Sequence, residues 1–262
     1  MPNLSHRSST LPYRKALITG ASSGIGKALA LDLARSGIFV VLAARNLQAL
    51  QQLQKQIHEE GGQAKVLTLD VSKAEQVAKI LQQVDEELGG IDLLIANAGI
   101  SERCSPAQLQ WDKVSATIDV NVRGATASIV ALLPRMTARK QGHIVGISSL
   151  AQYKGLPLAA SYSASKAFLS RFLESLRVDL RGSSVFITEV RPGFIQTPMT
   201  EGNTFKMPFV MDAGQASRII IKGIASKKAL VAFPTPMVWA MRLLTILPLS
   251  WYDRFIKKRR SD

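Results

Sequence analysis

The sequence predicts an α/β fold: a doubly wound parallel sheet, covered by helices on both faces. Short apolar runs without polar alternation recur along the chain, as in strands that are buried on both sides. Stretches with apolar residues at helical spacing separate these runs, so parallel strands joined by right-handed crossovers are expected. No linker, internal repeat or change in composition divides residues 14–235, which we expect to form a single domain.

The apolar runs and the helical periodicities place the individual elements. The expected strands are residues 16–19, 39–44, 65–69, 91–96, 143–148 and 185–190. The expected helices are residues 27–36, 47–60, 72–88, 111–139 and 162–181. Glycines end the first two helices, and Ser72 is the expected N-cap of the third.

The hydrophobic content and the few cysteines and histidines indicate a globular protein without a disulfide or a metal site. The chain has 262 residues, of which 47% are hydrophobic, enough for a substantial core. Cys104 is the only cysteine, so no intramolecular disulfide can form, and we interpret it as an incidental thiol. The histidines, His6, His58 and His143, lack metal-ligand spacing. We therefore predict no metal site.

The chain carries a strong positive charge. Lys and Arg number 33 against 19 acidic residues, for a net charge of +14. Residues 222–262 hold nine of these cations and two acids, so half of the excess lies at the C-terminus. Such a potential attracts phosphates, anionic lipid or nucleic acid. No helix-turn-helix, zinc or base-stacking pattern accompanies it, and nucleic-acid binding is not expected.

A glycine-rich turn follows the first strand, in the run Thr19-Gly20-Ala21-Ser22-Ser23-Gly24-Ile25-Gly26. A strand, a glycine turn and a helix start together form an anion site, because the helix N-terminus offers free N–H groups and the glycines let a pyrophosphate approach. The alternative is a tight turn that binds nothing. The spacing Gly-x-x-x-Gly-x-Gly differs from the Gly-x-Gly-x-x-Gly of the commonest dinucleotide folds.

A second motif lies further along, where Tyr162 precedes Lys166 by four residues. On a helix, side chains at i and i+4 lie on the same face. A free tyrosine has a pKa near ~10, and a nearby ammonium typically lowers the pKa of an acid by about 1–3 units. This pair is therefore a candidate proton-transfer group, although Tyr162 could instead be a half-buried helix tyrosine.

The glycine turn resembles that of the short-chain dehydrogenase/reductase family, and the resemblance covers nearly the whole chain. Further segments fall in the family's order: Asp70-Val71 after the third strand, Asn97-Ala98-Gly99 after the fourth, Asn121, Ser149 thirteen residues before Tyr162, and Pro192-Gly193 with Thr197. The resemblance implies a Rossmann-like single domain. The cofactor-binding residues it implies are Gly20, Ser22, Ser23, Gly24, Ile25, Gly26, Arg45, Asp70, Val71, Asn97, Ala98, Gly99, Tyr162, Lys166, Pro192, Gly193 and Thr197.

The resemblance also implies the catalytic roles. Tyr162 would donate a proton to a carbonyl oxygen in reduction and accept it in oxidation, while Lys166 lowers its pKa and binds the nicotinamide ribose. Ser149 would hydrogen-bond the substrate oxygen, and Asn121 would hold a water that links Lys166 to solvent. Ser149 could instead be a strand-end cap and Asn121 a turn former. Ser148 could also reach the site, and the thirteen-residue spacing favours Ser149.

The end of the second strand indicates which nicotinamide cofactor is used. NAD-using relatives carry an acidic residue there, whereas this chain has Ala44 followed by Arg45. A missing carboxylate removes repulsion against a 2′-phosphate, and an arginine offers a forked donor for it. We expect NADP(H) over NAD(H). The alternative is that Arg45 is a solvated loop residue.

The C-terminal third resembles the family less. Residues 200–212 occupy the place of the substrate loop, and Phe205, Met207, Pro208 and Phe209 favour a lipophilic substrate. Residues 237–247 are apolar and are followed by Trp251, Tyr252 and a basic run to residue 260. This pattern of residues 237–262 fits a helix at an anionic membrane surface, or a helix buried between subunits with a solvated tail.

The sequence thus predicts an NADP(H)-dependent oxidoreductase that transfers hydride between the nicotinamide and a carbonyl or secondary alcohol. The alternative is a nucleotide-binding sensor or scaffold without turnover. Residues 1–13 are expected to be a polar lead-in and residues 236–262 an extension of the same domain. Because residues 1–10 lack an apolar signal core, we expect a cytoplasmic protein, with peripheral membrane association left open. A homodimer or homotetramer is expected from the resemblance.

Overall fold

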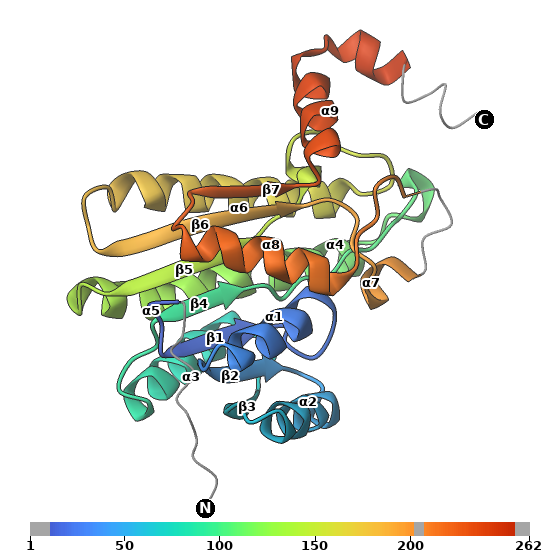
Figure 1. Cartoon of the computed structure of the whole chain (residues 1–262). Helices are drawn as coiled ribbons and strands as arrows, with labels where there is room; N and C mark the ends of the chain where they lie inside the picture. Colours follow the sequence, from blue (N-terminus) through green and yellow to red (C-terminus); the bar gives the residue numbers. More distant parts are fainter. Residues whose placement is uncertain (1–10, 202–206, 255–262) are drawn as a thin grey trace, which may run out of the picture.

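The structure, a computed structural model, describes residues 11–201 and 207–254 (Figure 1). Its centre is a seven-stranded parallel sheet with the order β3-β2-β1-β4-β5-β6-β7. The strands are β1 (Lys15–Thr19), β2 (Phe39–Ala44), β3 (Ala64–Thr68), β4 (Leu93–Ala96), β5 (Gly142–Ile147), β6 (Val185–Pro192) and β7 (Leu230–Phe233). The expected doubly wound, Rossmann-like α/β fold is confirmed.

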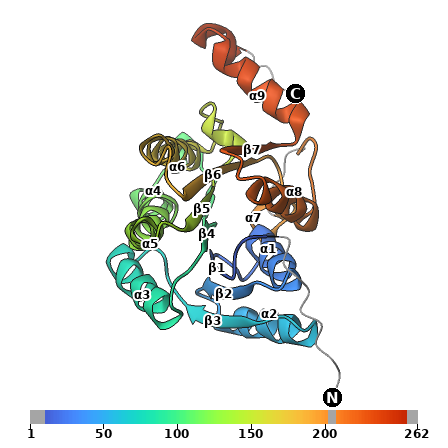
Figure 2. The ribbon, with the colours of Figure 1, turned by 60° about the vertical axis from the view of Figure 1, so that its left-hand side comes forward.

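Helices cover both faces of this sheet (Figure 2). The helices are α1 (Gly24–Arg35), α2 (Leu47–Glu59), α3 (Ala74–Glu87), α4 (Trp111–Ile118), α5 (Ala125–Ala138), α6 (Ala160–Asp179), α7 (Pro198–Glu201), α8 (Ala213–Ala225) and α9 (Thr235–Ile246). One face carries α1, α2 and α8, and the other carries α3, α5 and α6. Helix α9 stands beyond the β7 edge of the sheet (Figures 1 and 2).

The order of the strands creates a switch point beside β1. Strand β1 pairs with β2 on one side and with β4 on the other. The chain therefore leaves β1 toward one face and β4 toward the other, which opens a crevice at their carboxyl ends. Thr19 ends β1 and Ala96 ends β4, so the glycine turn and the Asn97-Ala98-Gly99 segment start at the same edge.

The core consists of two apolar layers, one on each side of the sheet. The layer under α1, α2 and α8 includes the fully buried residues Leu29, Leu33, Leu50 and Ile220. The layer under α3, α5 and α6 includes the buried residues Leu81, Ile129, Leu132 and Leu173. Burial of such residues contributes roughly 1.5–3 kcal/mol each. The sheet edge that holds the polar motifs is thus supported from both faces.

Several elements differ from the sequence expectation. The single helix predicted over 111–139 consists of α4, a π-helical segment (Asp119–Gly124) and α5. Helix α8 and strand β7 were not predicted. The predicted N-cap Ser72 is wrong: α3 begins at Ala74. The Ser72 hydroxyl instead donates to the Asp70 carboxylate over 2.8 Å, because this local bond competes with capping.

Two further findings concern the ends of the domain and the long helical stretch. Leu11 and Tyr13, which we assigned to the lead-in, are buried in the core layer under α1; residues 1–10 lie outside the described part. The stretch Trp111–Ala138 is long and apolar enough to cross a membrane by length and composition, but half of its most apolar window is buried in the fold. It packs as a core helix.

Candidate active site

The glycine turn after β1 is shaped by backbone conformations and close contacts that exclude side chains. Gly20 and Gly24 have φ values of +68° and +54°, which residues with a Cβ adopt rarely. A Cβ on Gly26 would lie 2.3 Å from the Gly20 carbonyl oxygen, and one on Gly24 would lie 2.9 Å from Thr197 Cγ2. The turn can therefore fold tightly and pack closely against Thr197 only because these positions lack side chains.

Asn97 and Thr19 clamp this turn to the end of β4. The Thr19 hydroxyl accepts from the Asn97 and Ala98 amides at 3.0 and 3.1 Å. The Asn97 side chain donates to the carbonyls of Thr19 and Gly20 at 2.9 and 3.2 Å. Asn97 thus serves as a structural brace, and Thr19 has a role that our sequence analysis did not assign.

Helix α1 begins directly behind the turn, as an anion site requires. Its N-cap Ser23 is extended, with no hydrogen bond from the side chain to the helix. The first N–H groups of α1 therefore have no capping partner from Ser23 and carry the positive end of the helix dipole. Within the described residues, the glycine turn, Ser22, Ser23 and Ile25 form the arrangement predicted for a pyrophosphate.

Lys166 lies on α6 and is buried, with 4% of its surface exposed. Its ammonium donates to the Ile147 carbonyl at the end of β5 over 2.8 Å. A Cβ on Gly99 would lie 3.3 Å from both Lys166 Nζ and Asn121 Oδ1, so the three residues converge. Burial lowers the pKa of Lys166 to about 8, because the charged form loses solvation.

Asn121 occupies the π-helical segment and is buried. Its amide exchanges two hydrogen bonds with the Ile100 backbone, both 2.8 Å, and donates to Ser165 Oγ over 3.0 Å. Such π-helical segments are frequent at functional sites. Asn121 is therefore not a turn former but joins the Gly99 segment to α6, while its water-holding role stays a prediction.

Tyr162 and Ser149 meet at the start of α6. Their side chains form a hydrogen bond, while burial raises the pKa of Tyr162 and this bond only partly offsets the effect. The Lys166 ammonium lies 5.8 Å from the centre of the Tyr162 ring. The expected lowering of the tyrosine pKa by Lys166 is therefore wrong for this geometry, because Lys166 is itself desolvated and directed at a carbonyl.

Ser149 also fills the role that we gave as its alternative. Its hydroxyl accepts from the Ala151 amide over 3.1 Å and caps a short 3-10 helix (Leu150–Gln152). A hydroxyl can accept one bond while donating another, so capping does not remove Ser149 from the site. The cap instead fixes the position of its oxygen beside the phenol.

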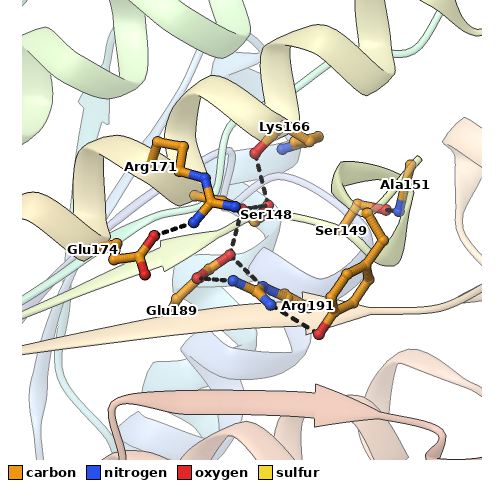
Figure 3. Close-up of polar contacts among 10 residues, drawn as sticks. Ser148, Ser149, Ala151, Lys166, Arg171, Glu174, Glu189 and Arg191 are labelled. Carbon is orange, nitrogen blue, oxygen red and sulfur yellow. Dashed lines mark hydrogen bonds and ion pairs between the residues drawn. The ribbon is translucent and has the colours of Figure 1, made fainter. Parts of the chain in front are cut away.

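Ser148 is directed into a buried chain of polar contacts (Figure 3). Its hydroxyl donates to the Lys166 carbonyl over 3.0 Å and pairs with Ser170 Oγ over 2.8 Å. Ser170 in turn donates to the Glu189 carboxylate. Ser148 is thus occupied by the backbone and a neighbouring helix side chain, which leaves Ser149 as the serine nearer the site.

The chain of polar contacts ends in a buried ion pair between β6 residues. Arg191 binds Glu189 through two nitrogens, at 2.6 and 2.8 Å, and donates to the Tyr153 hydroxyl over 2.8 Å (Figure 3). Sequence reasoning missed this network. Its only signal was two charged residues near the end of an otherwise apolar strand, which is unusual for a strand buried on both faces.

Arg45 and Asp70 lie at the ends of neighbouring strands. Arg45 follows β2, is exposed, and comes close enough to affect Asp70. Burial alone would raise the pKa of Asp70, but hydrogen bonds from Ser72 and the charges of Arg45 and Lys73 outweigh it and hold the pKa below its usual range. Val71 packs under Gly124. The residues predicted from sequence to contact the adenosine half therefore lie just after the neighbouring strands β2 and β3, and their role in binding stays a prediction.

The remaining predicted residues border the crevice on the β6 side. Pro192 ends β6, and the Gly193 amide donates to Phe233 O over 2.7 Å. Thr197 faces Gly24 through its methyl group. In the expected substrate loop, Phe205 lies outside the described residues, Phe209 is 58% exposed and Pro208 is exposed, so these side chains do not form a packed wall.

In the part of the chain that the structure describes, no group of three or more His, Cys, Asp or Glu residues could hold a metal ion. His143 illustrates the reason. Its ring nitrogens lie 2.6 Å from the Tyr13 hydroxyl and 2.7 Å from Thr188 Oγ1. Burial lowers its pKa to about 4, so it is a neutral core histidine, remote from the crevice.

Comparisons with known proteins agree with this geometry. A family profile described as short chain dehydrogenase matches residues 14–207. An uncharacterised oxidoreductase of Myxococcus xanthus is 45% identical over 250 residues, which cover 95% of this chain and 99% of that protein. The chain therefore belongs to the short-chain dehydrogenase/reductase family and is an oxidoreductase of that family.

Solved structures share the fold. A short-chain dehydrogenase/reductase from Burkholderia phymatum in complex with NAD has a TM-score of 0.81 at 24% identity, covering 88% of this chain and 92% of that one. A metagenomic short-chain oxidoreductase in complex with NADP has a TM-score of 0.74 at 28% identity, covering 86% and 97%. Structures of this fold thus hold either nicotinamide cofactor.

Proposed function

We propose that the protein is an NADP(H)-dependent oxidoreductase that transfers hydride between the nicotinamide and a carbonyl or secondary alcohol. The observation that carries the proposal is the convergence of Ser149, Tyr162 and buried Lys166 beside the glycine turn. A desolvated phenol hydrogen-bonded to a serine, with an ammonium on the same helix face, is suited to proton transfer and serves no evident packing purpose.

The residues present fit a dinucleotide. Gly20, Gly24 and Gly26 let the turn pack against Asn97, Ala98 and Thr197 where a Cβ would clash, and the N-terminus of α1 would hold the pyrophosphate. The adenine would lie near Asp70 and Val71, and the nicotinamide half near Gly99, Pro192, Gly193 and Thr197. Lys166 would bind the ribose. When bound, the reduced nicotinamide supplies the hydride that reaches the carbonyl carbon.

The protein's own part is proton transfer and placement. In reduction, Tyr162 Oη gives its proton to the carbonyl oxygen as the carbon–oxygen π bond breaks, and Ser149 donates a hydrogen bond where negative charge develops. The raised pKa of Tyr162 keeps the phenol protonated at neutral pH. The protonated phenol is the form that acts as the acid in reduction, and solvent then returns the proton.

Arg45 supports the choice of NADP(H). It is exposed at the carboxyl end of β2 and follows Ala44, where no carboxylate opposes a 2′-phosphate. Asp70 lies near enough to feel its charge, so the guanidinium is held at the adenosine edge. Arginine binds phosphate through two parallel hydrogen bonds. The 2′-phosphate of NADP(H), which NAD(H) lacks, would give Arg45 such a partner.

The substrate class follows from the side chains on the open side of the site. Phe209 and Val210 expose 58% and 48% of their surfaces, and Tyr153 and Leu156 are partly buried in the segment that follows Ser149. An apolar molecule would cover these side chains from water, which is favourable in proportion to the area buried. We propose a lipophilic small carbonyl compound or alcohol.

We also propose that the protein assembles as a homodimer or homotetramer through α6. Phe168 stacks on Phe172 with ring centres 6.0 Å apart, and 44% of Phe168 is exposed. Both rings border a shallow depression of about 570 Å³ on this helix. An exposed aromatic pair beside a depression is the kind of apolar patch that a second subunit covers.

Cofactor titration tests the proposed function. NADPH and NADH fluorescence would be followed with wild type, Arg45→Ala and the control Arg181→Ala, an exposed arginine before β6 at the opposite edge of the sheet. We expect tighter binding of NADPH than of NADH. The preference should fall at least about tenfold in Arg45→Ala, as loss of a charge-assisted pair predicts, and persist in Arg181→Ala.

Two results would contradict the proposal. Equal affinity for both cofactors in wild type would remove the NADP assignment. Absence of binding to either would remove the cofactor assignment altogether, whereas binding without turnover would favour the nucleotide-binding sensor or scaffold.

A further inference from the structure

Helix α9 and the residues after it expose several large apolar side chains. Trp239, Leu243 and Ile246 are 64%, 62% and 79% exposed. They are spaced by four and three residues and so lie on one side of the helix. Leu249 and Trp251, 71% and 64% exposed, continue the series. We call these five residues the α9 patch. Helix α9 projects from the sheet edge, clear of the main body (Figure 1).

The opposite side of α9 is fixed to the protein. Val238 and Met241 are buried against Leu150. Beyond the helix, Tyr252 is buried, its hydroxyl donates to the Gly155 carbonyl, and Lys154 lies over its ring at 5.0 Å. The helix is thus anchored at its start and after its end. The α9 patch therefore lies on a helix that is packed against the rest of the protein.

Positive charge surrounds this patch. The Arg242 guanidinium lies 5.6 Å from the centre of the Trp239 ring, and Arg254 is exposed. The sequence continues with Lys257, Lys258, Arg259 and Arg260, whose positions lie outside the described residues. Residues 235–262 carry six cations and two acids. The patch therefore combines large apolar side chains with a segment whose sequence carries net positive charge.

We propose that the α9 patch docks on an anionic phospholipid surface, with α9 lying in the plane of the membrane. Twelve residues of α9 span about 18 Å, too short to cross a bilayer. Tryptophans near both ends of the patch suit headgroup depth, leucine and isoleucine between them suit the acyl boundary, and the cations suit anionic headgroups.

Charge decides between lipid and a second copy of the chain. A symmetric dimer across the patch would bring the same basic segment of both subunits together. Like charges brought together oppose association, whereas an anionic surface neutralises all of them. The number of exposed apolar side chains alone does not distinguish lipid from a second copy of the chain. The net charge distinguishes them: residues 235–262 carry six cations and two acids, a net charge of +4.

Docking would also set the position of the site relative to the membrane. Leu150, which packs against α9, directly follows Ser149. A protein held by the α9 patch would keep this side of the site near the lipid surface. This consequence rests on the proposed function, while docking itself rests only on the patch and its charge, so each can fail without the other.

Vesicle flotation tests the docking. Vesicles of phosphatidylcholine with and without phosphatidylserine would be mixed with wild type, the double variant Leu243→Ser/Ile246→Ser and the control Leu109→Ser/Trp111→Ser. The control residues are 53% and 73% exposed and lie away from α9. We expect wild type and control to float only with phosphatidylserine vesicles, and the α9 variant to bind at least about tenfold more weakly, as loss of two apolar anchors predicts. Far-ultraviolet circular dichroism would report its folding.

Tryptophan fluorescence gives a second measurement. The chain has three tryptophans, so Trp111→Phe leaves only Trp239 and Trp251. We expect their emission to shift to shorter wavelength with phosphatidylserine vesicles and to be quenched by brominated lipid. The shift should be absent with phosphatidylcholine alone and should weaken with added salt, because the cations contribute through screened interactions.

Three outcomes would overturn the proposal. The first is a folded wild type that does not float with phosphatidylserine vesicles. The second is equal flotation of wild type and the α9 variant, which would mean that charge alone binds. The third is an α9 variant that converts a wild-type dimer to a monomer by light scattering while wild type ignores vesicles, which would assign the patch to a second copy.

Discussion

At the scale of the residue, the site depends on how burial changes two titratable groups. The pKa of Tyr162 is raised by burial, against the hydrogen bond from Ser149, and the pKa of Lys166 is lowered to about 8. Both shifts favour the neutral forms. At neutral pH the tyrosine therefore holds its proton, and the Lys166 ammonium gives up its proton more readily than that of a free lysine. The pair is prepared to donate a proton rather than to accept one.

Removal of the phenol hydroxyl should abolish reduction without disturbing the fold. We expect Tyr162→Phe to lower kcat for NADPH-dependent reduction of nitrobenzaldehyde, used as a probe, by roughly 10²–10⁴, the usual contribution of a positioned acid. NADPH affinity should change by less than about tenfold, since at most one neutral hydrogen bond is lost. Absorbance at the NADPH band measures the rate, and fluorescence titration measures the affinity.

The same variant reports the tyrosine pKa directly. The difference spectrum of wild type minus Tyr162→Phe isolates one of four tyrosines. We expect the tyrosinate band to appear only above about pH 10, since burial raises the pKa above the value of a free tyrosine. Ser149→Ala should move it higher, because the serine bond favours the phenolate. A tyrosinate band below about pH 8 would contradict the burial argument.

Much of this site could be predicted from spacing alone. Tyr162, Lys166 and the glycines stand at intervals that a helix and a turn require, so they can be identified in the sequence by their positions. The environment could not be predicted in that way. The direction of the Tyr162 pKa shift depends on burial by segments distant in sequence, and the orientation of Ser148 and Ser149 depends on α6 and on the cap at Ala151.

At the scale of the element, polar contacts fix α6 on the sheet. Ser148 at the end of β5 holds the Lys166 carbonyl, and Ser170 on α6 holds Glu189 of β6. Both bonds are buried, where an unsatisfied partner costs about 1–3 kcal/mol. They fix the rotation of α6, and hence the directions of Tyr162 and Lys166. Helix periodicity indicates that α6 exists, but not this rotation.

A second buried contact joins the start of the chain to β5 and β6. His143 lies between the Tyr13 hydroxyl and Thr188, and the Thr188 hydroxyl donates to the Lys228 carbonyl over 2.6 Å. The pKa of the folded His143 is about 4 against an ordinary 6.5. As the pH falls below 6.5, His143 is protonated in the unfolded chain but stays neutral in the folded protein. The free energy of unfolding that is present above pH 6.5 is therefore lost progressively as the pH falls toward 4.

The expected loss is measurable by urea unfolding. Between about pH 7.5 and about pH 5, His143 should remove roughly 2 kcal/mol of the free energy of unfolding. In His143→Gln this share of the pH dependence should vanish, because the amide does not titrate. The control His58→Gln, at an exposed histidine on α2, should keep it. An equal pH dependence in wild type and His143→Gln would disprove the assignment.

Strand β7 and the π-helical segment were not predicted from the sequence, each for a physical reason. Strand β7 has four residues at the sheet edge, and it is short enough to look like part of a loop. The π-helical segment has the same apolar periodicity as its flanking helices, so 111–139 reads as one helix. Its extra residue per turn is set by the contacts of Asn121 with the Ile100 backbone, which are tertiary.

At the scale of the whole molecule, two of the apolar surfaces exposed by the described residues bear on assembly. One is the aromatic pair on α6, on the face of the sheet that carries α3 and α5. The other is the α9 patch at the β7 edge. They differ in charge: Arg171 beside the α6 depression pairs with Glu174 of the same helix, whereas the α9 patch has an excess of cations. This difference is the reason that we propose a protein partner for the first surface and lipid for the second.

The assignment of α6 to subunit contact leads to a test on the full chain. Phe168→Asp places a carboxylate where the second subunit would bury a phenyl ring, and an unpaired buried charge is strongly unfavourable. We expect light scattering after size exclusion to show a dimer or tetramer for wild type and a smaller species for Phe168→Asp. Leu47→Asp, at an equally exposed position on α2 (45% against 44%), should leave the assembly unchanged. A monomeric wild type would contradict the proposal, as would a Phe168→Asp protein of wild-type size, because a carboxylate cannot be accommodated in a dry interface without loss of affinity.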